Sequence, residues 1–71
     1  MALNKFFVEY DEDAGRLGLQ DPEVGPLGYA YDYQDAYRRA KQLVREENVL
    51  RVRVVRRAKG QPEEVVAEVT A

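Results

Sequence analysis

The sequence predicts a single α+β domain over residues 1–71, in which an antiparallel sheet of four or five strands carries one α-helix on one face. Three observations lead to this expectation. The chain has 71 residues, which is enough for one small core. One segment, residues 33–47, has helical periodicity, and the segments around it alternate apolar and polar residues as strands do. A single helix can cover only one face of such a sheet, so the expected order is strand, strand, strand, helix, strand, strand, with a weak second strand.

The first two strands are expected to form a hairpin within residues 5–19. Residues 5–10 alternate apolar and polar side chains, and an acidic turn that ends in glycine follows them. A register that pairs Tyr10 with Leu17 and Val8 with Leu19 would place the apolar side chains on one face. The second strand is short and contains a glycine, so we expect it to be weak.

A loop over residues 21–26, rich in proline, glycine and acidic residues, leads to a brief third strand over residues 27–31. Asp32 is a suitable N-cap for a helix over residues 33–47, and Asn48 can end this helix in the left-handed conformation. The expected apolar stripe of the helix consists of Tyr33, Ala36, Tyr37, Ala40, Leu43 and Val44.

The last two strands, residues 50–57 and 64–70, are expected to form a second hairpin around Lys59–Pro62. One register explains both faces of this hairpin, because it matches apolar with apolar and basic with acidic residues. On one face it pairs Val52 with Val69 and Val54 with Ala67; on the other it pairs Arg57 with Glu64, Val55 with Val66 and Arg53 with Glu68.

The composition argues against an enzyme. The chain has no cysteine, histidine or tryptophan and no serine, which removes the usual nucleophiles, the usual general base and the common zinc ligands. We therefore expect no catalytic residue, no cofactor, no metal and no small-molecule substrate. The longest apolar runs are far shorter than the roughly 20 residues of a membrane span, and no secretory signal is recognisable, so we expect a cytoplasmic protein without a membrane partner.

Charge is unevenly distributed along the chain, although the net charge is only −2. Residues 38–59 contain nine basic and two acidic residues, whereas the segments on either side are acidic. The pattern predicts two candidate surfaces. The open sheet face would present Phe7, Arg51, Arg53, Val55, Arg57 and Val66, and the basic helix face would present Arg38, Arg39, Lys41 and Arg45.

Two interpretations of these surfaces remain open. Arginine beside an exposed aromatic residue is typical of a platform for single-stranded nucleic acid. The opposing interpretation, which the strand register favours, is that Arg53 and Arg57 pair with glutamates across the hairpin. The tyrosines Tyr29, Tyr31, Tyr33 and Tyr37 are likewise either the rim of a small core or a partner-binding patch.

The N-terminal two-thirds of the chain resembles the HicB-type antitoxin domain. The resemblance consists of a strand, an acidic glycine turn (Asp11 to Gly15), a second strand, the loop Pro22-Glu23-Val24-Gly25 and a capped helix. It implies binding to a toxin or to nucleic acid. The chain departs from that family by closing with a second long hairpin, in which it resembles small uncharacterised bacterial domains with two strands on either side of one helix.

These observations favour a small non-enzymatic protein-interaction module. We expect it to form a homodimer, or to bind another protein, through the open sheet face or the C-terminal edge strand. The alternative is a small RNA- or DNA-binding or antitoxin-like protein that uses its arginine-rich strand or the basic helix face.

Overall fold

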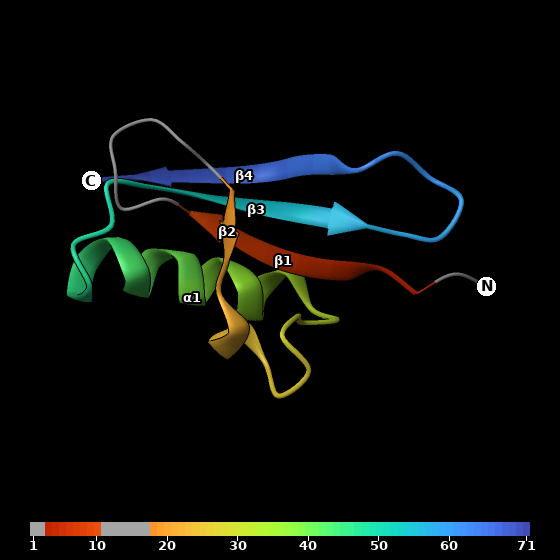
Figure 1. Cartoon of the computed structure of the whole chain (residues 1–71), viewed down its shortest axis with the longest axis horizontal. Helices are drawn as coiled ribbons and strands as arrows, with labels where there is room; N and C mark the ends of the chain where they lie inside the picture. The colour runs from red at the N-terminus through yellow and green to blue at the C-terminus, as the bar shows by residue number, and fades with distance from the viewer. Residues whose placement is uncertain (1–2, 11–17) are drawn as a thin grey trace.

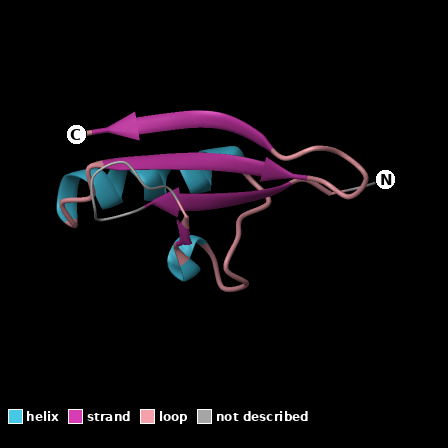
Figure 2. Cartoon of the chain, turned by 45° about the horizontal axis from the view of Figure 1, so that its top comes forward, coloured by secondary structure: helices cyan, strands magenta, loops and turns pink. Residues whose placement is uncertain are grey.

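The computed structural model describes residues 3–10 and 18–71. Within them, a four-stranded antiparallel sheet of order β2-β1-β3-β4 carries one helix on one face (Figures 1 and 2). The elements are β1 (Lys5–Tyr10), β2 (Leu19–Gln20), the short 3-10 helix η1 (Pro22–Val24), α1 (Tyr33–Glu46), β3 (Arg51–Arg57) and β4 (Glu64–Thr70). This architecture confirms the predicted α+β class. In the described part of the chain, no helix is long and apolar enough to cross a membrane.

The core lies between the sheet and α1. Phe6 and Val8 of β1 pair with Arg56 and Val54 of β3, and this register points Phe6 and Val8 toward the helix. Burying such aliphatic side chains is the main term that stabilises a domain of this size. The buried members of the core are Phe6, Val8, Val24, Ala30, Ala36, Ala40, Leu43, Val49, Val52 and Val54.

Helix α1 begins and ends as the sequence predicts. The Asp32 side chain caps it by accepting a hydrogen bond from the Gln34 backbone N–H at 3.0 Å. At the other end, Asn48 adopts a left-handed φ of 58°, and the Val49 N–H donates to the Leu43 carbonyl. The predicted stripe packs on the core except at Tyr37, which lines a hollow on the basic helix face, and only the alanines and Leu43 are fully buried.

The predicted third strand is reduced to a single bridge. Phe6 and Ala30 exchange two backbone hydrogen bonds, of 2.7 and 2.9 Å, and no further pairing surrounds them. The expectation of a strand over residues 27–31 was therefore wrong. Gly28 sits in a left-handed conformation with φ of 81° and closes a turn onto Gly25, so the chain bends where a strand would continue.

The first hairpin pairs two residues away from the predicted register. Tyr10 pairs with Leu19 and Glu9 with Gln20, so the expected pairing of Val8 with Leu19 was wrong. The Asp21 N–H then donates to the Val8 carbonyl at 2.9 Å, which continues the contact beyond β2. Leu17, the other expected partner, lies outside the described residues.

The second hairpin confirms the predicted register over half its length. Val52 faces Val69, Arg53 faces Glu68 and Val54 faces Ala67. Beyond Val54 an irregularity shifts the register by one, so that Val55 faces Val65 and Arg56 faces Glu64. The predicted pairs Val55–Val66 and Arg57–Glu64 were therefore wrong. A bulge of this kind interrupts the alternation of faces along β4.

Candidate functional site

The centre of the open sheet face is a buried carboxylate. The side chain of Glu9 on β1 is only 8% exposed and accepts hydrogen bonds from Arg53 and Arg57, each at 2.8 Å. Arg57 also binds Glu63 on the loop before β4 at 2.6 Å. The predicted ion pairs of these arginines with Glu68 and Glu64 are thus replaced by pairs that join β1 to β3. Because both arginines are held by carboxylates, their charge is largely neutralised within the sheet.

The apolar patch expected on this face is smaller than predicted. Val55 is fully buried, and Val66 packs against the helix-facing core because the bulge turns it to that side. Phe7 is half-buried, with the Tyr29 ring 5.6 Å and the Arg57 guanidinium 4.3 Å from its ring centre. Of the residues predicted for this surface, Arg51 is half-buried and lies opposite Thr70 at the end of β4. The apolar surface of the open face is therefore limited to the half-buried Phe7 and to Val65, which lies opposite Val55 and is 47% exposed.

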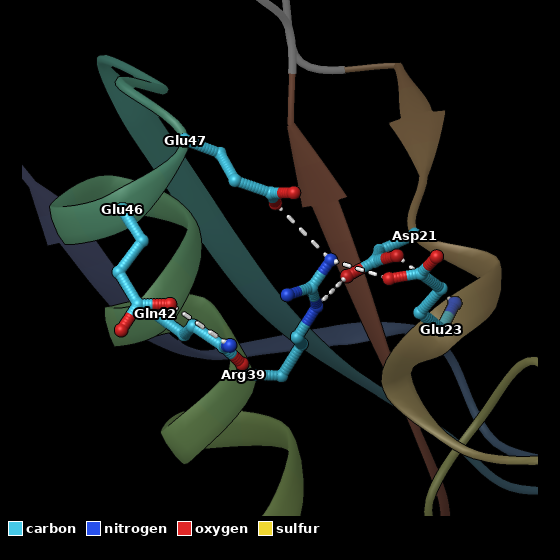
Figure 3. Close-up of polar contacts among 6 residues, drawn as sticks. All are labelled: Asp21, Glu23, Arg39, Gln42, Glu46 and Glu47. Carbon is cyan, nitrogen blue, oxygen red and sulfur yellow. Dashed lines mark hydrogen bonds and ion pairs between the residues drawn. The ribbon is translucent and has the colours of Figure 1, made fainter.

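Arg39 was predicted to face water on the basic helix face, and this was wrong. Its side chain is 13% exposed and binds Asp21 and Glu23, the latter at 3.1 Å, in the segment before the helix (Figure 3). It also binds Glu47, at the C-terminal end of α1, at 3.1 Å. Asp21 itself is 2% exposed. The hydrogen bond to Asp21 raises the pKa of Arg39 above the ordinary arginine value, against an opposing effect of burial. Arg39 therefore fastens this segment to α1 instead of presenting charge to a ligand.

The remaining basic helix face is small. Arg38 is 77% exposed and pairs with Asp35 at 3.2 Å, and the Lys41 ammonium lies 5.4 Å from the centre of the Tyr37 ring. With Arg45 and Gln34, these side chains line a shallow hollow of about 240 Å³. This is the part of the predicted basic surface that stays accessible.

The tyrosine cluster divides into two pairs. Tyr33 and Tyr37 stack on the helix with ring centres 5.7 Å apart, and Tyr33 also meets Phe6 edge-on in the core. Tyr29 and Tyr31 lie beside β1, with their hydroxyl groups 3.2 Å apart. The hydrogen bond with Tyr29 raises the pKa of Tyr31 above its ordinary value. One pair thus forms the rim of the core, and the other is available at the surface.

A larger cavity, of about 510 Å³, lies between residues 23–32 and the first half of α1. No pattern in the sequence predicts this cavity, because its walls meet only through tertiary contacts. Two large apolar side chains of its lining are exposed, Leu27 by 64% and Tyr31 by 53%. The only signal in the sequence was the pair of capping aspartates, Asp21 and Asp32, that hold the two ends of this segment.

The two edges of the sheet differ. At the β2 edge, β1 is covered by two residues of strand, by Asp21 and by the bridge to Ala30. At the other edge, β4 is paired along its length with β3, and the described residues place no strand on its outer side. The backbone of β4 is therefore the longer accessible edge of the sheet.

The described residues contain no cluster of acidic side chains that could hold a metal ion. Comparison of the chain with protein-family models, with curated proteins and with solved structures finds no match in any of the three. The resemblance to HicB-type antitoxin domains thus gains no support from these comparisons, and its acidic turn, Asp11 to Gly15, lies outside the described residues.

Proposed function

We propose that this protein is a non-enzymatic interaction module that forms a homodimer by antiparallel pairing of β4 with β4 of a second copy. The observation that carries this proposal is the asymmetry of the sheet, which ends on one side in the two-residue strand β2 and on the other in the seven-residue strand β4. An open edge strand is a template for a further strand, because its outward N–H and C=O groups lack partners.

The charges and the bulge of β4 restrict the possible registers. Pairing centred on Glu68 would place two glutamates directly opposite each other, which is destabilising. Registers centred nearer the start of β4 run across the irregularity at Val65 and Val66, where the alternation of faces is interrupted. Both considerations disfavour these alignments.

Pairing centred on Val69 avoids both problems. Val69 would face Val69 of the second copy on the side of the helix, where it already packs against the core. Glu68 would face Thr70 of the second copy on the open face, without a like charge opposite it. The result is a continuous sheet that runs through both copies of the domain.

The test is a charge switch at Thr70, which is exposed and lies opposite Arg51. In the dimer, Thr70→Glu would set a carboxylate against Glu68 at two symmetric positions, and Thr70→Lys would set an ammonium there. Two cross-strand contacts of about 0.2–1 kcal/mol each correspond to a change in the dimer Kd of about 2- to 30-fold, upward for Thr70→Glu and downward for Thr70→Lys.

Sedimentation equilibrium measures this Kd for the wild type and both variants. Thr70→Glu retains a partner in Arg51 within its own chain, so a lower dimer fraction would not reflect loss of folding. A wild type that stays monomeric at every concentration overturns the proposal. A dimer whose Kd responds equally to both variants places the interface elsewhere.

A second candidate function is binding of single-stranded nucleic acid by the basic helix face. The hollow that Tyr37 shares with Lys41 and Arg45 favours it, because it combines an aromatic ring with two cations. Fluorescence anisotropy with mixed-sequence RNA at about 50 and about 200 mM salt tests it, since phosphate contacts weaken steeply over that range. Lys41→Glu should abolish such binding, and a salt-independent signal would exclude phosphate contacts.

A further inference from the structure

The segment that forms one wall of the cavity beside α1 is held at both ends and at its turn. At one end of the segment, Asp21 binds Arg39 and accepts a hydrogen bond from the Glu23 N–H at 2.9 Å. At the other end, Ala30 is bridged to β1 by two backbone hydrogen bonds. In between, Gly25 packs so closely on the Tyr29 carbonyl that a Cβ would lie 2.5 Å from its oxygen. A binding site with walls held in this way loses little conformational entropy when a ligand enters.

The side chains around the cavity give it a negative electrostatic potential. Arg39 is surrounded by three carboxylates, from Asp21, Glu23 and Glu47, which more than neutralise it. Arg38 is balanced by Asp35. Asp32 forms no ion pair with any described residue, and its charge exceeds the half positive charge of the helix N-terminus that it caps. One further cation adjoins the cavity, because the Lys5 ammonium lies 4.7 Å from the centre of the Tyr29 ring. The five carboxylates that line or adjoin the cavity still outnumber its three cations, so these charges favour a cation.

Apolar surface lies next to this charge. Leu27 and Tyr31 are among the most exposed large apolar side chains of the described residues, and both line the cavity. Tyr31 directly precedes Asp32, so an aromatic ring and an unpaired carboxylate adjoin. Apolar and aromatic groups with a few polar ones are typical of a recognition pocket.

We infer that this cavity binds a segment of a partner protein that carries an arginine or lysine beside a bulky apolar residue. The basic side chain pairs with Asp32 and lies against the Tyr31 ring, where cation–π attraction adds to the ion pair. The apolar side chain covers Leu27. An anionic partner such as a phosphopeptide or RNA would meet the carboxylates of Glu23, Asp32 and Asp35 instead, so this site and the basic helix face select opposite charges.

The test uses the peptide acetyl-Leu-Arg-Leu-amide as a probe, with acetyl-Leu-Glu-Leu-amide as its acidic counterpart. Titration of the isotope-labelled protein, followed by amide chemical shifts, should move the signals of Leu27, Tyr31, Asp32 and Asp35 with the arginyl peptide only. Equal shifts with both peptides, shifts confined to other residues, or no shifts at all would each overturn the inference.

Two variants locate the contact. Asp32→Asn removes the charge but keeps a good helix cap, so the fold is retained while the Kd rises up to about fivefold, the effect of an exposed ion pair. Leu27→Ser should raise the Kd by about five- to tenfold through lost apolar contact. The matched control is Glu63→Gln, which removes the same charge from the loop before β4, outside the lining of the cavity, and should leave the Kd unchanged. An unchanged Kd in Asp32→Asn contradicts the assignment. Because none of these measurements depends on β4, they stand or fall independently of the proposed dimer.

Discussion

Replacing Arg39 by methionine should cost a large part of the stability of this domain. Methionine fills a similar volume and keeps helix propensity, so the change mainly removes charge. It leaves the carboxylate of Asp21, which is 2% exposed, without its counter-charge. Breaking a buried ion pair by removing one partner costs about 3–5 kcal/mol.

The expected loss of stability depends on which of the Arg39 contacts are buried. The pairs of Arg39 with Glu23 and Glu47 involve side chains that are 75% and 50% exposed, so they contribute little. The Arg39 side chain itself retains 13% exposure, which places the expected loss near the lower end, at about 3 kcal/mol. A domain of this length has a total stability of about 4–10 kcal/mol, and a loss of this size lowers Tm by about 12–24 °C.

The assay is urea denaturation followed by circular dichroism, together with thermal melting. The matched control is Arg38→Met, one position earlier on the same helix, whose side chain is 77% exposed and, among the described residues, forms an ion pair only with Asp35. This control removes the same charge and should change stability by less than about 0.5 kcal/mol. In the Asp21→Asn variant, the additional substitution Arg39→Met should lower the free energy of unfolding much less than it does in the wild type, because the two side chains interact.

Equal stability of Arg39→Met and Arg38→Met would refute this reasoning. So would additive losses in the double variant of Arg39 and Asp21, because they would show that the two side chains do not interact.

Three further results are expected. Glu9→Gln should destabilise the domain by about 1–2 kcal/mol in urea denaturation, because two partly exposed arginines lose a buried carboxylate; no change would mean that the network on the open face is not formed. Gly28→Ala should lower the free energy of unfolding by about 1–2 kcal/mol, because alanine is strained at a φ of 81°. Gly18→Ala, where a Cβ meets open space and no positive φ is required, should be neutral or slightly stabilising. Reversed effects would contradict the turn geometry. In an ultraviolet titration of the tyrosines, Tyr29→Phe should return the raised pKa of Tyr31 toward 10.0. A group whose pKa is raised on folding favours the folded state below its unfolded pKa, so this contribution is lost only as the pH rises above about 10, and an unchanged titration would rule out the hydroxyl contact.

The elements that local sequence specifies were predictable. The helix over Tyr33–Glu46 depends on its cap at Asp32, its apolar period and the left-handed Asn48, all of which act within a few residues. The register of the last hairpin near Val52 and Val69 follows from side-chain matching across one short turn. Short-range capping and alternation were therefore sufficient for the fold class and most of the boundaries.

The candidate sites depended on contacts between distant segments. Arg53 lies opposite Glu68 as predicted, yet it binds Glu9, because β1 inserts beside β3 and brings a buried carboxylate to the centre of the sheet. Arg39 has the periodicity of a water-facing residue, yet it turns to Asp21, 18 positions earlier in the chain. Local patterns state which side chains are charged but not which charge of opposite sign will be nearest.

For this protein, the amino-acid sequence by itself determined a one-helix antiparallel α+β domain, its helix caps and half of its second hairpin, because these features rest on interactions between near neighbours. Only the tertiary structure decided which arginines are neutralised, which edge of the sheet stays open and where the 510 Å³ cavity lies. Burial strengthens electrostatic pairing between segments far apart in the chain, and that burial exists only once the whole domain has folded.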